Sequence, residues 1–243
     1  MKLPSFALFL VAGSLTLWGA DNCDCTHFPI KPRTCATVCA SKRLDAAADV
    51  LNDLTHVSDK GVPQDILDKA KCVLIVPGLK RTGSVFGAGA GRGFASCRRA
   101  TGTGWTAPAA IRMEGGSIGF QIGGSVSDVV LLVTNKSGTK HLLSDKFTLG
   151  GDASAGAGPV GRDATAQTDA ELHTEMLSYS RSRGVFSGVS LEGVTLRPDS
   201  DTNQELYGRD VSNREILSGK VNATGSSAKF EGILNRTLSP RIK

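Results

Sequence analysis

The sequence predicts an α+β fold: a largely antiparallel, glycine-rich and curled sheet that approaches a barrel, with helices packed at its N- and C-terminal ends. Three observations predict it. An early stretch repeats apolar residues at helical spacing, and several later stretches are short apolar or alternating runs typical of strands. The 29 glycines among 243 residues also exceed the usual fraction of about 7%. Such a glycine content indicates tight turns or strands that pack unusually close together.

The first twenty residues have the order of a secretory signal peptide. Lys2 gives a basic start, residues 6–12 and 15–17 form an apolar core, and residues 19–20 are small enough for cleavage. The polar residues that follow at once argue against a membrane span, although the bulky Trp18 leaves an uncleaved anchor as the alternative. We expect an exported protein, secreted or periplasmic, that can lie at the periphery of a membrane.

The six cysteines fall into two groups. Residues 21–40 form a cysteine-rich segment with Cys23, Cys25, Cys35 and Cys39, and the other two are Cys72 and Cys97. An even number in an exported chain predicts disulfides, two of them local and with their pairing open. A Cys72–Cys97 bond would stabilise the fold by about 3–4 kcal/mol. The local spacing could also hold zinc, but it is not a standard finger pattern, and we expect no metal.

An amphipathic helix is predicted over residues 40–57. Its apolar residues recur three and four positions apart, at Leu44, Ala47, Ala48, Leu51 and Leu54. Polar and acidic residues fall on the opposite face, which is the pattern of a helix packed on a core. Pro63 then suits the first turn of a second, short helix that ends at Ala70.

The next segments predict two strands. Residues 72–76 are continuously apolar and stop at Pro77 and Gly78, which indicates a buried strand. Glycine then occupies every second position from Gly87 to Gly93. Period two is the spacing of one face of a strand, so these glycines should line one side of an extended segment and let a helix or another strand pack close.

The remaining elements follow the same two patterns. Extended segments continue the sheet over residues 118–122, 129–133, 147–157, 176–181 and 185–191. Residues 137–143 suit a short helix between strands, and residues 212–215 form a capping box that opens another helix, ending at Leu217. Beyond Gly219 the sequence is polar and aperiodic, which predicts a flexible tail.

Two short glycine motifs suggest enzymes, and we set both aside. Residues 115–119 match G-x-S-x-G around Ser117, but that motif needs a strand-to-helix turn and strand-like alternation follows here. Residues 156–161 match G-x-G-x-x-G, but Pro159 would remove a backbone donor from the phosphate loop. The histidines show no metal-ligand spacing. We therefore expect no catalysis, no cofactor and no metal site.

One stretch is strongly basic although the whole chain carries a formal charge of only +5. Residues 69–113 contain no acidic residue and eight basic ones: Lys69, Lys71, Lys80, Arg81, Arg92, Arg98, Arg99 and Arg112. Such a run predicts a positive surface for an anionic partner, unless acids such as Asp145 or Glu192 fold over it and neutralise it. The stretch contains no nucleic-acid-binding module, so we expect no nucleic acid. A membrane surface fits better, because anionic lipids attract basic patches.

Several motifs together resemble the SYLF domain, in the order in which that family has them. They lie at residues 70–77, 87–93, 104–108, 119–123, 128–133, 157–162, 179–193 and 203–208. The resemblance spans about residues 41–219 and implies a lipid-binding module without catalytic activity. Eukaryotic members of the family bind phosphoinositides, and the yeast actin-patch proteins among them bind actin filaments. Bacterial members are similar to exported or lipid-anchored envelope proteins, and this chain resembles an exported one. An exported protein would not meet actin, so we do not expect actin as a partner.

The chain departs from the family at its first helix. Eukaryotic members use a basic amphipathic helix at the start of the domain to reach the membrane. Here only Lys42 and Arg43 are basic, whereas Asp45, Asp49 and Asp53 are acidic and would repel anionic lipid. We therefore expect this helix to pack on the sheet, with Lys42 and Arg43 assisting binding at most.

These observations divide the chain into a signal peptide (1–20), a cysteine-rich segment (21–40), a SYLF-like lipid-binding domain (41–219) and a flexible tail (220–243). We expect a non-catalytic protein that binds anionic phospholipid, with headgroups of the phosphoinositide type. The expected contact residues are Lys80, Arg81, Arg92, Arg98 and Arg99, with Lys42 and Arg43. The alternative is an envelope or extracellular module that binds a protein partner and no lipid.

Overall fold

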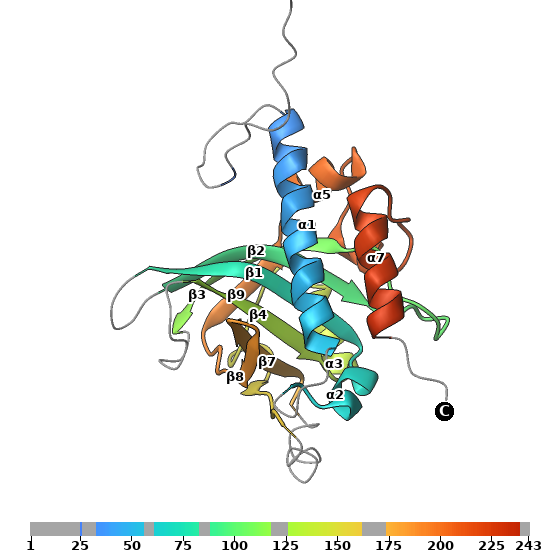
Figure 1. Cartoon of the computed structure of the whole chain (residues 1–243). Coiled ribbons are helices and arrows are strands. Elements are labelled where there is room, and N and C mark those ends of the chain that lie inside the picture. Colours follow the sequence, from blue (N-terminus) through green and yellow to red (C-terminus); the bar gives the residue numbers. More distant parts are fainter. Residues whose placement is uncertain are drawn as a thin grey trace, which may run out of the picture.

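The computed structural model describes residues 25, 33–55, 61–82, 88–117, 126–161 and 174–238. The expected signal peptide, Cys23 and the expected strand over residues 118–122 lie outside the described residues. Figure 1 shows a curled sheet with helices packed against it. The α+β class with a largely antiparallel, curled sheet is confirmed.

The described strands form one sheet. They are β1 (Cys72–Thr82), β2 (Ala88–Cys97), β3 (Ala109–Ser117), β4 (Val126–Val133), β5 (Phe147–Thr148), β6 (Ala155–Ala157), β7 (Met176–Ser182), β8 (Val185–Gly188) and β9 (Val194–Pro198). Their order is β5-β9-β3-β2-β1-β4-β7-β6, and β8 also pairs with β7. All pairs are antiparallel except β6 with β7.

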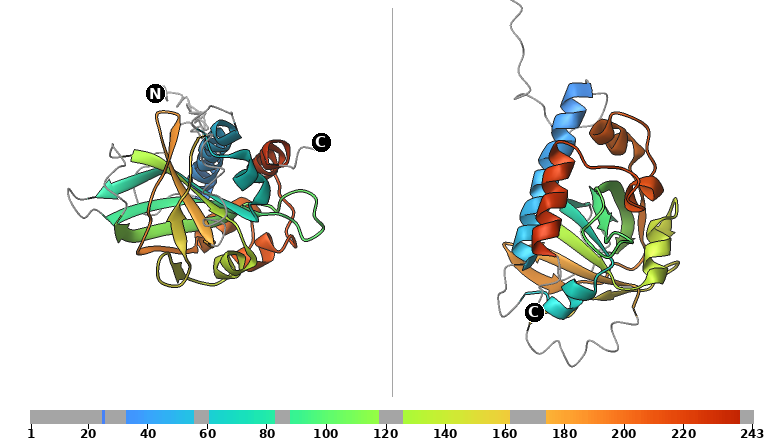
Figure 2. Two further views of the ribbon diagram at one scale, coloured as in Figure 1. Left: turned by 90° about the horizontal axis from the view of Figure 1, so that it is seen from below. Right: turned by 90° about the vertical axis from the view of Figure 1, so that its right-hand side faces the viewer.

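The helices are α1 (Arg33–Thr55), α2 (Gln64–Lys69), α3 (Lys136–Leu142), α5 (Ser200–Tyr207), α6 (Asn213–Leu217) and α7 (Ser226–Thr237). α1 and α7 lie side by side over one face of the sheet, which we call the outer face (Figures 1 and 2). The two helices run parallel, because Ser41 contacts Ser226 at 3.0 Å and Lys229 pairs with Asp45 at 2.8 Å. Within the described residues no helix combines the length and apolar character needed to cross a membrane.

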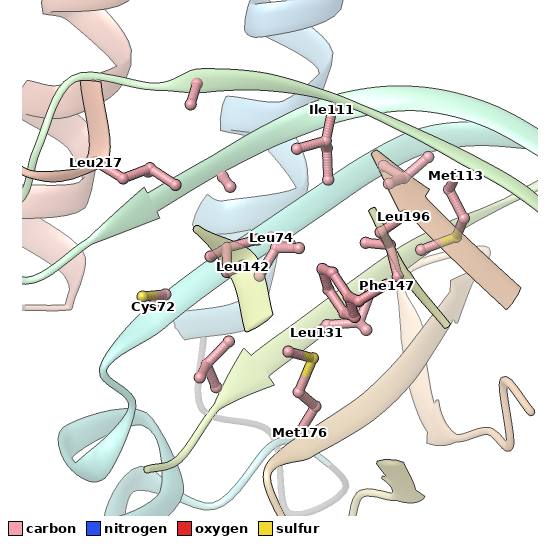
Figure 3. Packing of buried hydrophobic residues seen from close by; sticks show 14 of the residues in the cluster. Cys72, Leu74, Ile111, Met113, Leu131, Leu142, Phe147, Met176, Leu196 and Leu217 are labelled. Atoms are coloured by element: carbon pink, nitrogen blue, oxygen red, sulfur yellow. The ribbon is translucent and has the colours of Figure 1, made fainter. Parts of the chain in front are cut away.

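The sheet separates two apolar cores, as strand alternation requires. The inner core fills the concave side and includes Leu74, Met113, Leu131, Phe147 and Leu196 (Figure 3). The outer core lies beneath α1 and α7 and includes Leu44, Leu51, Phe94, Trp105 and Phe230. Residues one apart on a strand therefore point into different cores, as Leu74 and Ile75 do.

β1 does not stop at Pro77 and Gly78, contrary to the expected strand end. It continues to Thr82 across an irregularity in its pairing with both neighbours. The alternating glycines of β2 make room for this irregularity: a Cβ at Gly93 would lie 2.8 Å from the Val76 Cα. The missing side chains of β2 thus allow the backbone of the adjacent strand, β1, to pack close to it.

Two expected boundaries are also wrong. The first helix begins at Arg33 rather than near residue 40, so Cys35 and Cys39 belong to α1 and not to a separate module. Part of the expected tail is α7, whose Phe230 and Leu234 are buried in the outer core. α2, α3 and the capping box that opens α6 agree with expectation.

Candidate anion-binding cleft

A cleft of about 450 Å³ is lined by residues of α1, β1, β2 and β3. These strands extend beyond α1 on the side away from α7 (Figure 1). Its charged lining residues are Arg43, Lys80, Arg92, Arg112 and Glu114, and Cys25 contributes to the wall. The volume falls in the range of roughly 300–1,000 Å³ that is typical of small-molecule sites. We call it the basic cleft.

Strand register sets a row of arginines across the sheet, of which Arg92 and Arg112 line the basic cleft. Arg92 of β2 lies opposite Arg112 of β3, which in turn lies opposite Arg197 of β9. Like charges directly opposite one another destabilise a sheet unless an acid compensates them. Glu114 pairs with Arg197 at 2.6 Å and compensates one end of the row.

Asp199 compensates the other end. Its carboxylate is fully buried and lies 2.7 Å from Arg112 and 3.4 Å from Arg92. It is also the N-cap of α5 and accepts a hydrogen bond of 2.9 Å from the Thr202 hydroxyl. Burial alone would raise the pKa of Asp199, but the hydrogen bond from Arg112 and the charge of Arg92 hold that pKa below its usual value.

α5 is fixed on β3, which explains how Asp199 reaches the arginines. Asn203 accepts a hydrogen bond from the Ala110 backbone and donates one to Asn213, at 2.8 and 2.6 Å. Asn213 in turn donates to the Ala110 carbonyl at 3.0 Å, and the Tyr207 hydroxyl donates to Pro108 at 2.6 Å. This buried network places the start of α5 beside the row of arginines.

Two cations of the basic cleft, Arg43 and Lys80, form no ion pair in the described chain. Arg43 lies half-buried on α1, and burial, followed by the positive charge of Arg92, lowers its pKa. Glu205 faces the same cluster, and burial together with the charge of Asp199 raises its pKa. The Arg112 Nε is buried without a hydrogen-bond partner in the described chain. The cleft therefore offers an anion two positive charges that are not paired with an acid, on Arg43 and Lys80.

The expected contact residues are only partly brought together. Lys80, Arg92 and Arg43 line the basic cleft, with Lys80 exposed at its edge. Lys42 is exposed and does not line the cleft. For Arg81 the structure describes the backbone in β1 but not the side chain.

Arg98 and Arg99 lie at the opposite end of β2 and hold the C-terminal part of the fold. Arg98 donates to the carbonyls of Ala70 and Leu238, both at 2.8 Å, and lies 4.7 Å from the Trp105 ring centroid. Arg99 pairs with Glu231 of α7 at 3.0 Å. We leave both out of the candidate site.

The basic run over residues 69–113 is therefore partly neutralised by acids. This agrees with the alternative considered for the sequence, but the acids are not the ones that were expected. Asp199, Asp201 and Glu231 supply the counter-charges, all from the C-terminal part of the chain. Asp145 and Glu192 form no ion pair with the run in the described chain. Its remaining positive charge is concentrated in the basic cleft and on exposed lysines.

The structure contains disulfides in both cysteine groups. Cys72 bonds to Cys97 across the β1–β2 pair, in which the two residues lie directly opposite one another. Cys25 bonds to Cys39 of α1 and so brings residue 25 to the wall of the cleft. Cys35 is also disulfide-bonded.

One of the two enzyme-like motifs has a structural explanation. In the first motif Ser117 ends β3, and residues 118–119 lie outside the described residues. In the second motif, Gly158 packs on the ring of Tyr179, where a side chain would overlap it. The described residues contain no group of three or more acidic, histidine or cysteine side chains placed to hold a metal ion.

Sequence reasoning left Arg112, Glu114 and Asp199 out of the site. Arg112 belongs to the basic run, and its alternation with buried Ile111 and Met113 was a usable sign that it faces away from the inner core. Asp199 gave no such sign, because its approach to Arg112 spans 87 residues of sequence.

The chain matches the family model described as Ysc84, a Las17-binding protein actin regulator, over residues 114–237. It is also 36% identical over 180 residues to an SH3 domain-containing protein of Schizosaccharomyces pombe, a match that covers 73% of this chain and 41% of the relative. LAS seventeen-binding protein 3 of Saccharomyces cerevisiae is 35% identical over 167 residues, covering 68% and 36%. SH3 domain-containing YSC84-like protein 1 of Rattus norvegicus is 31% identical over 195 residues, covering 78% and 57%. The matched region thus spans about a third to just over half of these relatives.

Proposed function

Because this chain belongs to the Ysc84 (SYLF) family, we propose that it is a non-catalytic binding protein whose basic cleft binds the headgroup of an anionic phospholipid. The family model is described as an actin regulator and one relative is named for binding a protein, which agrees with a non-catalytic role. The observation that supports the site most directly is Arg43, a half-buried cation without an ion pair that faces the cleft.

The chemistry of the basic cleft suits a phosphate group of the phosphoinositide type. Arginine binds phosphate oxygens through several N–H donors at once, and lysine adds a point charge. Arg43 and Arg112 line the cleft with guanidinium groups, and Lys80 lies at its exposed edge. The cleft thus combines guanidinium groups with an exposed point charge, a combination that suits a phosphate group.

We also propose that the protein is exported and acts at the periphery of a membrane. The order of its first twenty residues supports export. The paired cysteines Cys72–Cys97 and Cys25–Cys39 support an oxidising compartment, because disulfides persist there and are rare in the cytosol.

Vesicle flotation tests the binding proposal. We expect the wild type to float with phosphatidylcholine vesicles that carry a phosphatidylinositol phosphate and not with phosphatidylcholine alone. Arg43→Ala and Lys80→Ala should each weaken binding, on the order of tenfold for the partly buried Arg43. Lys42→Ala is the matched control, since it removes a neighbouring positive charge that does not line the cleft. Equal losses in all three variants would show a diffuse charge effect and count against the site.

A protein partner is the second candidate, and the names of the relatives favour it. One of them is named for binding LAS seventeen, so a protein ligand is a reasonable alternative for this chain. A pull-down that recovers one stoichiometric partner, together with no vesicle binding, would favour this alternative over lipid.

A further inference from the structure

The outer face of the sheet has an exposed apolar residue at the edge of the basic cleft. Val126, the first residue of β4, is 55% exposed. It lies opposite Lys80 in the β1–β4 pair, and its Cγ1 would lie 3.9 Å from a Cβ at Gly78. Gly78 and Lys80 both line the cleft, so Val126 borders it directly.

A row of side chains crosses the sheet at this point. Strand register sets Val126 opposite Lys80, Lys80 opposite Ala90, and Ala90 opposite Glu114. The row is apolar at one end and cationic next to it, and its one acid, Glu114, is paired with Arg197. The row therefore combines an apolar side chain with an exposed positive charge.

The acid closest along the chain to Val126 is also in an ion pair, with an arginine that it shares with Asp53 of α1. Asp128 pairs with Arg181 at 3.0 Å and accepts a hydrogen bond of 2.8 Å from the Gly78 backbone. No acid in the described chain pairs with Lys80. An anionic surface that approached this edge would meet a positive charge beside an apolar side chain, which is the combination that attaches peripheral proteins to bilayers.

The apolar face of α1 could contact a bilayer only if the helix detached from the sheet. Its apolar residues are buried against the sheet, Asp53 pairs with Arg181 of β7 at 2.8 Å, and Asp45 pairs with Lys229 of α7 at 2.8 Å. β1 and β2, by contrast, extend past α1, and no helix of the described chain lies over this part of them (Figure 1). The accessible surface at the edge of the basic cleft is therefore formed by strand ends, those of β1, β2 and β4.

We propose that the domain docks on an anionic bilayer through this edge, with Val126 entering the lipid at the level of the acyl boundary and Lys80 lying among the headgroups. The inference rests on the proposed function and adds to it the orientation of the domain on the membrane. In this orientation the basic cleft opens toward the headgroups. We assign this surface to a bilayer because the positive charge of Lys80 complements anionic headgroups, and because the surface is continuous with the basic cleft.

Tryptophan substitution tests the orientation, because the chain offers a matched control. Val185 of β8 is 58% exposed, almost the same as Val126, but it does not border the cleft. After subtraction of the wild-type spectrum, we expect the emission of Val126→Trp to shift to the blue on phosphatidylcholine vesicles carrying a phosphatidylinositol phosphate, and to be quenched by bromine-labelled acyl chains. Val185→Trp should show neither change.

A second pair of variants tests the same contact without a fluorescent side chain. Val126→Asp should lower the fraction of protein that floats with these vesicles by about tenfold, while Val185→Asp leaves it unchanged. If the wild type floats and Val126→Trp is not quenched, or if Val185→Trp is quenched equally, the orientation is wrong although lipid binding stands. If Val126→Asp abolishes capture of a protein partner and not flotation, the edge is a protein contact instead. Failure of the wild type to float would remove both the proposed function and this inference.

Discussion

Arg112 lies 2.7 Å from Asp199, whose carboxylate has no exposed surface, and this contact joins the third strand to the start of α5. The same carboxylate lies 3.4 Å from Arg92, so one acid separates two arginines that strand register places side by side. The basic cleft depends on this arrangement, because without Asp199 the two guanidinium groups would repel each other.

Asp199→Asn should therefore destabilise the protein. Asparagine still caps a helix, so the variant isolates the loss of charge. Removing one partner of a buried pair is costly, and because the arginines are partly exposed we expect a decrease of about 2–3 kcal/mol in the free energy of unfolding. Urea unfolding measures it. Asp201→Asn, which removes the exposed partner of Arg112, should cost no more than about 0.5 kcal/mol, and equal losses would contradict the assigned role.

The contribution of Asp199 should depend on pH. Burial opposes ionisation, but Arg112 and Arg92 hold the pKa of Asp199 below its usual value. An acid with a lowered folded-state pKa stabilises the protein above its unfolded pKa of about 3.9 and loses that contribution as the pH falls through the folded value. The difference in unfolding free energy between the wild type and Asp199→Asn should narrow as the pH is lowered below about 4. A difference that stays constant down to pH 2 would exclude an electrostatic origin.

Arg98 should contribute to stability and not to lipid binding. Its guanidinium bonds the carbonyls of Ala70 and Leu238 and stacks on Trp105. We expect Arg98→Ala to lower the unfolding free energy by about 2 kcal/mol. Flotation of the folded variant should equal that of the wild type, and a selective loss of flotation would return Arg98 to the site.

Gly93 should not tolerate alanine. The added Cβ would lie 2.8 Å from the Val76 Cα and in hard contact with the Ile75 carbonyl, so a backbone strand would have to move. We expect a loss of about 3 kcal/mol or more in a thermal or urea unfolding measurement. Gly151→Ala is the control, since its nearest neighbour would be 3.8 Å away, and it should change stability by no more than about 0.5 kcal/mol.

The Cys72–Cys97 bond closes a loop between residues 25 apart. Replacing both cysteines with alanine should lower the unfolding free energy by about 3 kcal/mol, by the entropy of the released loop. Comparison of urea unfolding for the wild type and the double variant measures the loss. Mass spectrometry of the purified protein that finds both thiols free would contradict the bond itself.

Local patterns in the sequence predicted the elements that depend on local chemistry. The apolar spacing of α1, the run that forms β4 and the capping box of α6 were all correct. Phe230, Ile233 and Leu234 lie at helical spacing, so the signal for α7 was present but weak among polar neighbours.

The basic cleft could not be predicted in the same way. The register that sets Arg92 opposite Arg112 depends on how β2 and β3 pair, and the irregularity in β1 depends on close packing against Gly93. Asp199 reaches the arginines only because Asn203 and Asn213 anchor α5 on β3. These are properties of the assembled sheet and not of any one segment.

The parallel pairing of α1 with α7 has a consequence for the order of folding. Ser41 and Ser226 touch although 185 residues separate them, so all of the intervening sequence must be synthesised before this contact can form. α1 therefore leaves the ribosome well before α7, the helix that packs beside it. Long-range contacts of this kind slow folding, and an intermediate without α7 would present Phe94 and Trp105 to solvent. Completion of the domain must therefore wait until α7 has left the ribosome, and a nascent chain would need protection until then.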